Sequence, residues 1–452
     1  MKIQGQTSRP VAGIEGLPPW AGRPSPWGLP WSGIIERREW FEHFHEAPPF
    51  REPSPLRLRV LRHRPGDVPR VLLGAGAWPG NLLTSPLARL MDAGPGPLEE
   101  RLASVKTEDV LAALAGSPLS GTEGKSAAAL LSLVSPAADA LRPAILDAAG
   151  AATRARFGGR VLLYAPLYLS NECTSLCVYC GFRFGNPIRR VTLTKERIGE
   201  EAAALARQGT RRVLLLAGDA PRRFGVDDLD EAVRAVAGSF KTVSVEVFPM
   251  STGDYARLVE AGIRGVTLYQ ETYDIGLYRA VHPGGRKRNL LWRLGALERA
   301  AAAGVATIGI GSLLGLGDWR FETVALGLHG RKLLDLFPGL GLTVSFPRLR
   351  PIHGGFAPPR PVSDEELCHM MAALRLFLPE AGLVLSTRES PALRDRLAPI
   401  VITQMSAGSR TAPGSYAPVS SDEAPGRQFD IEDTRTLLEI EDRLKSLGLD
   451  VV

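Results

Sequence analysis

Apolar runs that predict β-strands alternate with amphipathic segments of helical period from about residue 159 onward. Such alternation is typical of a parallel α/β fold. Eight predicted strands over about 250 residues indicate a (β/α)8 TIM-type barrel. The strands are expected at 161–169, 211–217, 242–248, 265–270, 306–313, 341–346, 382–386 and 400–404, and the helices at 194–208, 226–238, 253–261, 290–303, 320–335, 363–377 and 390–396.

The chain outside this region has three other patterns. Residues 98–158 are rich in Ala and Leu at helical spacing, broken by Pro136 and Pro143, and predict a helical lead-in. Residues 1–97 hold 16 of the 36 prolines and five of the seven tryptophans without a sustained period, so they predict a disordered or accessory extension. A Pro-rich partner-binding arm is the alternative. The barrel is expected over 159–412, and a C-terminal cap of helix and short strand over 413–452.

Charge and composition exclude several classes of protein. Lys and Arg outnumber Asp and Glu by twelve to eight in residues 1–97, which accounts for +4 of the net charge of +6. No basic stripe for nucleic acid is therefore expected on the barrel. The sequence has no run of eighteen apolar residues and no secretory h-region at its start, so no membrane association is expected. With only four cysteines, a disulfide framework is not expected, and the predicted location is the cytoplasm.

Three of the four cysteines lie within eight positions, directly after the first predicted strand. Cys173, Cys177 and Cys180 follow the spacing Cys-x3-Cys-x2-Cys. Three thiolates are one short of the tetrahedron of a structural zinc site. They are enough for a 4Fe–4S cluster, whose fourth iron can be left to a ligand that is not protein. A zinc site completed by a remote His or Cys, or three core cysteines, are the alternatives, but the clustering favours iron and sulfur.

Polar residues follow every predicted strand, on the side where the active sites of such barrels lie. We therefore expect an active site on that rim. In chain order these residues are Asn171 beside the cysteines, Gly218 and Asp219, Glu246, Gln270 and Glu271, Ser312 and Asp318, Arg348 and Arg350, Ser386 to Glu389, and Ser406 and Arg410.

The cysteine spacing, with Tyr179 before the third cysteine and Gly181-Phe182 after it, resembles the signature of the radical S-adenosylmethionine (SAM) enzymes. Further motifs resemble one family within that superfamily, 2-iminoacetate synthase, a tyrosine lyase of thiazole and thiamine biosynthesis. The resemblance runs from about Val105 to the end of the sequence. Its motifs are LYLSNEC, CVYCGF, YQETY at 269–273, SFPRLRP at 345–351, LSTRES at 385–390 and MSAGSRTAPGSY at 405–416.

This resemblance implies a reaction and its cofactors, a 4Fe–4S cluster and SAM. A 5′-deoxyadenosyl radical takes a hydrogen atom from the amino group of L-tyrosine, and the Cα–Cβ bond breaks to give 2-iminoacetate (dehydroglycine) and p-cresol. Methionine and 5′-deoxyadenosine are the co-products. Thiazole synthase is the implied recipient of the imine, and flavodoxin or ferredoxin the implied reductant.

Three alternatives stay open at this point. A related lyase acting on tryptophan is the first. The tyrosine lyase of hydrogenase maturation is the second, although it carries a second cluster on a C-terminal cysteine motif, whereas only Cys368 follows Cys180 in this sequence. A structural or redox iron–sulfur or zinc barrel is the third, but it would not need a polar group at every strand end.

The resemblance also implies roles for the cofactor residues. Cys173, Cys177 and Cys180 are the iron ligands. The backbone near Tyr179 and the ring of Phe182 would hold adenine. The remaining cofactor candidates are Gly218 and Asp219 for the methionine amine, where most of the superfamily has Glu in place of Asp, Glu246 for the ribose, and Arg293 for the methionine carboxylate, unless Arg293 lies on a solvated helix face.

The substrate residues are expected on the later strands. Arg388 is the candidate for the substrate carboxylate, and Ser406 and Tyr168 match positions that contact the polar end of the substrate. Glu271 is a further catalytic candidate. Beyond these four, Arg348 and Arg350 would either share the task of Arg388 or form ion pairs with Glu271 and Glu389.

Overall fold

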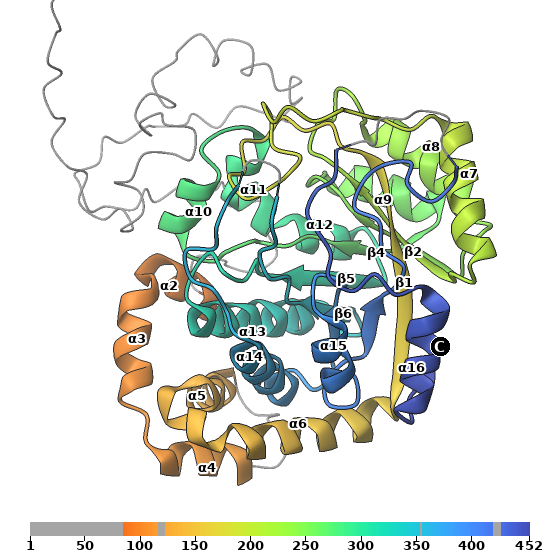
Figure 1. The fold of residues 1–452 in the computed structure, drawn as a ribbon. Coiled ribbons are helices and arrows are strands. Elements are labelled where there is room, and N and C mark those ends of the chain that lie inside the picture. Colours follow the sequence, from red (N-terminus) through yellow and green to blue (C-terminus); the bar gives the residue numbers. More distant parts are fainter. Residues whose placement is uncertain (1–84, 116–122, 353–354, 419–425) are drawn as a thin grey trace, which may run out of the picture. The chain divides into compact units, whose positions relative to one another are not determined.

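Eight parallel strands close into a barrel in the computed structural model (Figure 1). The structure describes residues 85–115, 123–352, 355–418 and 426–452. The strand order β2-β3-β4-β5-β6-β7-β8-β1 is closed by pairing between β1 and β2, which confirms the predicted (β/α)8 barrel. The strands are β1 (Arg160–Ser170), β2 (Arg212–Ala217), β3 (Thr242–Glu246), β4 (Ile263–Thr267), β5 (Thr307–Gly311), β6 (Gly341–Ser345), β7 (Gly382–Leu385) and β8 (Gln404–Ser406).

The helices that connect the strands begin where the sequence offers a capping side chain. Thr194 Oγ1, for example, accepts a hydrogen bond from the backbone N–H of Arg197, and Ser363 forms a capping box with Glu366. The helices are α7 (Lys195–Arg207), α8 (Val226–Val236), α9 (Thr252–Ala261), α10 (Ile275–Val281), the 3-10 turn η4 (Arg286–Arg288), α11 (Leu290–Leu294), α12 (Ala296–Ala302), α13 (Trp319–Leu336), α14 (Asp364–Phe377) and α15 (Pro391–Leu397).

The lead-in helices form a further layer outside α13 and α14 (Figure 1). Pro143 lies in the first turn of α6 and so starts that helix, where the missing N–H of proline costs nothing. His369 of α14 bonds the carbonyl oxygen of Leu133 at 2.7 Å, which ties this layer to the barrel. The lead-in comprises α2 (Pro86–Ala93), α3 (Pro95–Ala103), α4 (Thr107–Ala115), α5 (Glu123–Val134), η3 (Pro136–Leu141) and α6 (Arg142–Phe157).

Several predicted boundaries were wrong, and helix α10 was not predicted. The helical lead-in begins at Pro86 rather than at residue 98, because Leu87 and Met91 of α2 are buried; residues 1–84 of the predicted extension lie outside the described residues. The helix expected at 290–303 is divided at Gly295 into α11 and α12. The last strand is Gln404–Ser406 and not 400–404, because residues 400 and 401 still form turns on the end of α15.

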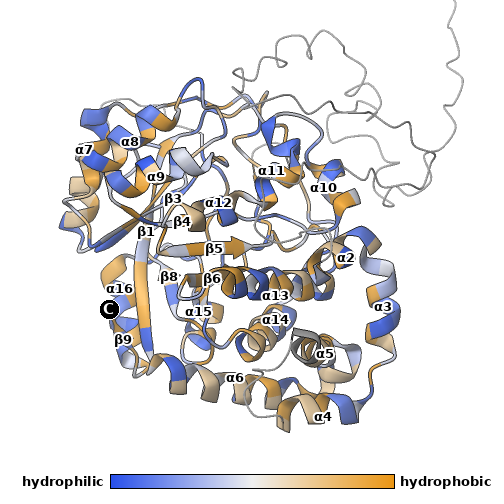
Figure 2. Cartoon of the chain, turned by 180° about the vertical axis from the view of Figure 1, so that it is seen from behind, coloured by the Kyte–Doolittle hydropathy of each residue, from blue (hydrophilic) through white to orange (hydrophobic). Residues whose placement is uncertain are grey.

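The inside of the barrel is lined by small and hydroxylated side chains rather than by the branched aliphatic residues usual in such barrels. The space there, about 480 Å³ free of protein atoms counting its open ends, is bordered by Ser244, Thr267, Thr307, Thr343 and Gln404, with Leu214 and Val384 as aliphatic members of the lining. The apolar side chains instead fill the space between strands and helices. In Figure 2, hydrophobic colour follows β5, and it alternates with hydrophilic colour along outer helices such as α7 and α8.

Beyond β8 the chain covers first one end of the barrel and then the other. Residues 426–433, which we call the strap, run along the rim at the C-terminal ends of the strands. The helix α16 (Leu437–Ser446) and the short strand β9 (Asp450–Val451) follow, and β9 pairs with Arg160 and Val161 at the start of β1. No single helix in the described ranges is long and apolar enough to cross a bilayer. Two consecutive helical segments, residues 127–134 and 136–157, together have the length and apolar composition of a bilayer span, but they are bent by 72° relative to each other.

Candidate active site

The alternation of side chains along β1 separates the core from the site. Leu163, Leu167 and their odd-numbered neighbours pack against the helices. Tyr164 and Tyr168 point the other way and line a cavity at the barrel mouth. β1 ends with a register shift against β2 between Tyr168 and Ser170. Residues 171–183, which follow and carry the three cysteines, are called the cysteine loop.

Arg190 holds the cysteine loop in one shape. Its guanidinium donates hydrogen bonds to the backbone carbonyls of Asn171, Phe182 and Arg183 at 2.6–2.8 Å. Five N–H donors in a rigid fork suit arginine to such a task. These protein contacts order the loop.

Two neighbouring loops pack tightly on this loop. A Cβ atom at Gly218 would lie 2.1 Å from the carbonyl oxygen of Glu172, and one at Gly285 would lie 2.5 Å from the backbone of Ser175. The backbone N–H of Thr174 donates to the carbonyl oxygen of Asp219 at 3.0 Å. Gly218 therefore allows the loop after β2 to approach the cysteine loop closely, while its predicted approach to the methionine amine stays a prediction.

The three thiols fit an iron–sulfur cluster. Burial raises the pKa of each, to about 11 for Cys173 and further for Cys177, and the ammonium of Lys287 is the largest opposing influence for Cys177 and Cys180. Thiols in such surroundings need a strong electrophile to lose their protons. Within the described part of the chain, no three His, Cys, Asp or Glu side chains converge on a point that would hold one metal ion.

The predicted cofactor residues Asp219 and Arg293 lie beside this loop, each in an ion pair. Asp219 pairs with Arg286 at 3.2 Å. Arg293 is only 8% exposed and donates to the carbonyl oxygen of Tyr269 at 2.7 Å, so a solvated helix face is excluded for it. Glu271 lies 3.4 Å from Arg293 and 2.5 Å from the ammonium of Lys287. The carboxylate of Glu271 is thus held by two cations.

Two aromatic side chains of the cysteine motif have protein partners. The hydroxyl of Tyr179 lies 2.6 Å from Nε2 of His282, whose Nδ1 lies 2.8 Å from the carbonyl oxygen of Tyr278. His282 is thus buried with both ring nitrogens in hydrogen bonds. The ring of Phe182 meets that of Tyr168 edge to face, with 5.7 Å between their centroids.

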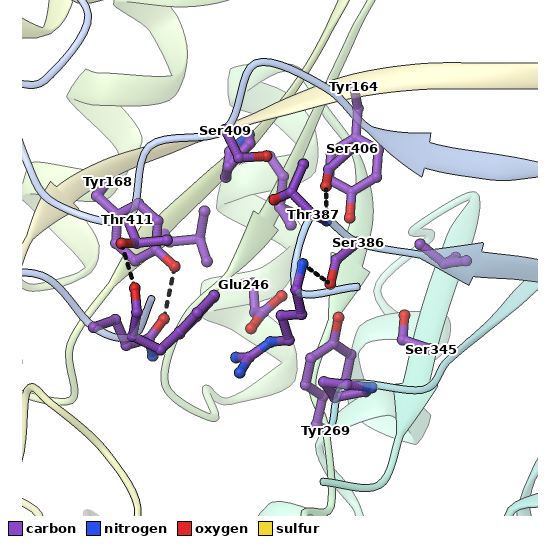
Figure 3. A pocket seen from close by; sticks show the side chains of 18 of the residues that line it. Tyr164, Tyr168, Glu246, Tyr269, Ser345, Ser386, Thr387, Ser406, Ser409 and Thr411 are labelled. Carbon is purple, nitrogen blue, oxygen red and sulfur yellow. Dashed lines mark hydrogen bonds between the residues drawn. The ribbon is translucent and has the colours of Figure 1, made fainter. Parts of the chain in front are cut away.

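A cavity with about 580 Å³ free of protein atoms, counting its open mouth, lies on the predicted rim (Figure 3). Its polar lining collects the predicted residues Tyr168, Glu246, Arg388 and Ser406 from four different strands. Apolar walls complete it. Its other lining residues include Tyr164, Leu214, Leu216, Tyr269, Ser345, Phe346, Val384, Ser386, Thr387, Ser409, Thr411, Gln428 and Phe429.

Glu246 and Arg388 give this cavity its charges. Burial is the main reason that the pKa of Glu246 is raised, to about 7; Glu271 raises it further, and Arg388 is the strongest influence that lowers it. Arg388 forms no ion pair with any carboxylate in the described residues. Its one side-chain hydrogen bond goes to the carbonyl oxygen of Arg348, at a long 3.4 Å. The guanidinium therefore has donors left for an acidic ligand.

Several residues of the predicted rim have structural roles instead. The side chain of Asn171 binds the backbone of Arg189, Val191 and Gly426. Arg348 was expected either to bind substrate or to form an ion pair. It pairs with Glu389 and with Asp364, so the ion pair is the one observed. Of the rest, Arg350 pairs with Glu432 rather than with Glu271, Asp318 caps α13, and Ser312 donates to Glu322.

Four residues near the site were not among those predicted from the sequence. Ser409 is 4% exposed and its hydroxyl has no hydrogen-bond partner among the described residues, although it lines the cavity. Lys287 lies in a basic turn, GRKR, that resembles any surface turn. Gln428 and Phe429 come from the strap. Only Ser409 lay inside a quoted motif, MSAGSRTAPGSY, and that position was the available signal.

Comparison with known proteins agrees with this geometry. Residues 167–326 match the Radical SAM superfamily, and residues 345–450 match the Biotin and Thiamin Synthesis associated domain. The chain is 40% identical to 2-iminoacetate synthase of Escherichia coli (strain K12) over 289 residues, covering 64% of this chain and 77% of that one. With 2-iminoacetate synthase of Salmonella typhimurium it shares 39% identity over 325 residues, covering 72% and 85%.

Solved structures are similar as well. A crystal structure of HydG, a maturase of the [FeFe]-hydrogenase, aligns with a TM-score of 0.72 and 31% identity over 78% of each chain. Methylornithine synthase (PylB) aligns with a TM-score of 0.56 at 22% identity, over 78% of this chain and 97% of that one, which shows the fold alone.

The barrel, its cysteine loop and the superfamily match together define a radical SAM enzyme, a class that uses a 4Fe–4S cluster and SAM. The identities to the two enterobacterial proteins narrow this class further. The chain belongs to the 2-iminoacetate synthase family.

The raised pKa of Glu246, taken together with the role at the ribose predicted for it from the sequence, predicts a pH dependence of SAM use. A group with a pKa of about 7 is mostly protonated below that pH, and a protonated carboxyl accepts fewer hydrogen bonds from ribose hydroxyls. The KM for SAM should therefore rise about fivefold to tenfold between about pH 8 and about pH 6, as the ionised fraction falls. The measurement is the SAM dependence of 5′-deoxyadenosine formation at each pH. Glu246→Gln should flatten this part of the profile, and equal slopes in both proteins would contradict the assignment.

Gly218→Ala should damage the site through the backbone. The added Cβ would overlap the carbonyl oxygen of Glu172 at 2.1 Å, so the cysteine loop or the loop after β2 must move. A displacement near 1 Å in a reacting site costs on the order of a hundredfold in rate, and we expect a loss of that size in 5′-deoxyadenosine formation. Gly199→Ala on α7 is the matched control, because nothing lies within 4 Å of its Cβ position. Equal rates in the two variants would show that the close contact is not needed.

Proposed function

We propose that this protein cleaves the Cα–Cβ bond of L-tyrosine to give 2-iminoacetate and p-cresol. The observation that carries the proposal is the cavity on the rim, where Arg388 lies without a carboxylate partner among the described residues, next to the cysteine loop. The 2-iminoacetate synthases of the two enterobacteria support it by their similarity to this chain.

When bound, the cluster and SAM supply a 5′-deoxyadenosyl radical that takes one hydrogen atom from the amino group of tyrosine. The residues of the chain hold the substrate for that event. Arg388 would bind the α-carboxylate through its N–H donors, while Ser406 and Tyr168 contact the polar end of the amino acid. The hydroxyl of Ser409, buried without a partner in the described residues, is a further donor or acceptor for the same end.

The bond that breaks divides tyrosine into two unequal parts. The hydrogen atom taken from the amino group ends in 5′-deoxyadenosine, and every other atom of tyrosine is found in 2-iminoacetate or in p-cresol, once the p-hydroxybenzyl fragment has taken up one electron and one proton. A one-electron reductant must therefore deliver two electrons per turnover, one for the radical and one for this fragment. The walls formed by Leu214, Leu216 and Val384 exclude water from the aromatic part.

Two partners follow from this reaction. The imine hydrolyses readily in water, so an enzyme that consumes it is expected to take it up directly; thiazole synthase is our proposal. Flavodoxin or ferredoxin is our proposal for the reductant. The match to the Biotin and Thiamin Synthesis associated domain supports the first of these.

The test uses the full chain with its iron reconstituted without oxygen. Dithionite, SAM and L-tyrosine are added, and 5′-deoxyadenosine and p-cresol are measured by mass spectrometry. Both products in equal amounts are expected. Formation of 5′-deoxyadenosine with L-tryptophan but no p-cresol with L-tyrosine would move the activity to another aromatic amino acid. Neither product from protein with a verified cluster would overturn the proposal.

A further inference from the structure

The strap is fixed at both ends to loops of the active site. At one end, the side chain of Asn171 in the cysteine loop donates to the carbonyl oxygen of Gly426 at 3.1 Å. At the other end, the backbone N–H of Asp433 donates to the carbonyl oxygen of Thr387, next to Arg388, at 3.1 Å. A segment distant in sequence thus joins the loop that carries the thiols to the loop that carries the substrate cation.

Between these ends the strap touches the cysteine motif itself. The backbone N–H of Gly181 donates to the carbonyl oxygen of Gln428 at 3.0 Å. A Cβ at Gly181 would lie 2.5 Å from the same oxygen, so any other residue after Cys180 would push the strap away. The backbone of Gln428 is therefore in direct contact with the cysteine loop.

The side chain of Gln428 links the substrate side to the cluster side. Its Oε1 accepts a hydrogen bond of 2.6 Å from the hydroxyl of Tyr168, and its Nε2 lies 3.9 Å from Sγ of Cys180. The amide can accept from the phenol and donate toward the sulfur at once, whereas an ionised carboxylate of the same length can only accept. The choice of residue therefore matches both neighbours.

Phe429, the next residue of the strap, orients the guanidinium of Arg388, the predicted partner of the substrate carboxylate. The ring of Phe429 lies 3.3 Å from Cζ of Arg388, in a face-on cation–π contact. The hydroxyl of Thr411 donates to the carbonyl oxygen of Phe429 at 2.8 Å and fixes the backbone there. With one face of the guanidinium covered by the ring, its N–H edge is left for a ligand in the cavity.

We propose that Gln428 and Phe429 are positioning residues that set the distance between the radical source and the substrate. Gln428 fixes Tyr168 relative to Cys180, and Phe429 fixes the plane of Arg388. A radical delivered to one hydrogen atom requires that the two groups be held within a few tenths of an ångström, which separate loops do not guarantee. This proposal rests on the proposed function for the identity of the substrate.

Gln428→Met keeps the size of the side chain and removes both hydrogen bonds. Its ratio of 5′-deoxyadenosine to p-cresol should rise about tenfold, because radicals form but miss their target more often. The electron paramagnetic resonance (EPR) spectrum of the reduced cluster with SAM should also change, because a neighbour of Cys180 has been removed. Arg427→Gln is the control on the same strap. Its side chain is 69% exposed and pairs with Asp430, so neither readout should move.

Phe429→Leu tests the other half of the proposal. The KM for L-tyrosine should rise about fivefold through loss of the cation–π contact, while the EPR spectrum and the tyrosine-free cleavage of SAM stay unchanged.

A folded, iron-loaded Gln428→Met protein with an unchanged ratio of 5′-deoxyadenosine to p-cresol and an unchanged EPR spectrum would overturn the proposal. The proposal would also be overturned if both Gln428→Met and Gln428→Glu lost iron while the protein that kept its cluster had a normal ratio of 5′-deoxyadenosine to p-cresol. Gln428 would then be a structural residue. If the unmodified protein makes 5′-deoxyadenosine but no p-cresol, the proposed function fails, whereas the EPR comparison still decides the role of Gln428.

Discussion

Cys177→Ala is expected to abolish both 5′-deoxyadenosine and p-cresol. Cys177 is the middle cysteine of the motif and is the predicted iron ligand with a buried side chain, so water is a poor replacement for it. The two remaining thiolates would leave a second iron without a protein ligand, and the cluster would be lost. Alanine is chosen over serine because a hydroxyl is a possible iron ligand. Iron content and the absorbance of the cluster are measured beside the two products.

The fourth cysteine supplies the control for this experiment. Cys368 is completely buried in α14 and packs in the apolar core. Cys368→Ala should keep full iron content and both products, with a loss of stability of about 1 kcal/mol from the small cavity. If Cys177→Ala retained iron and activity, the radical SAM assignment of this loop would be wrong.

Arg388→Gln is expected to lower p-cresol formation about a hundredfold to a thousandfold. A bidentate pair between a guanidinium and a carboxylate consists of two charge-assisted hydrogen bonds, each worth about 1.5–3 kcal/mol, and a neutral amide cannot replace them. Much of the loss should appear as a raised KM for L-tyrosine. Cleavage of SAM without substrate should continue, because Arg388 lies on the loop after β7 and the cysteines on the loop after β1.

Arg410→Gln is a suitable comparison for this variant. Arg410 also follows a strand of the predicted rim, but its side chain is exposed and does not line the cavity. Its substitution should leave the KM for L-tyrosine unchanged. An equal effect of both substitutions would mean that the net charge of the rim, and not the position of Arg388, attracts the substrate.

The strands and most helices could be predicted because the signals that define them are local. A period of two or of 3.6 residues is visible within one segment, and capping residues such as Thr194 and Ser363 mark where helices begin. The errors fell where a tertiary contact replaced the local signal. Helix α2 exists because Leu87 and Met91 have a core to pack against, although the residues around it are rich in proline and glycine.

The candidate site was predicted in part, for a similar reason. Barrel topology brings the ends of all strands to one rim, so Glu246, Arg388 and Ser406 were expected together, and one cavity collects them. Topology does not say which polar side chains on that rim already have partners. Arg348 and Arg388 look alike in sequence, but Arg348 is neutralised by Glu389 and Asp364.

The sequence by itself determined the barrel, the order of its strands and the three thiols of the cysteine loop, because these depend on periodicity and on spacing within eight residues. Only the tertiary structure decided which side chains complete the site. Gln428 meets Tyr168 across 260 residues of chain and Cys180 across 248. No local pattern encodes a contact at that separation, since it depends on how the strap returns to the rim after the last strand.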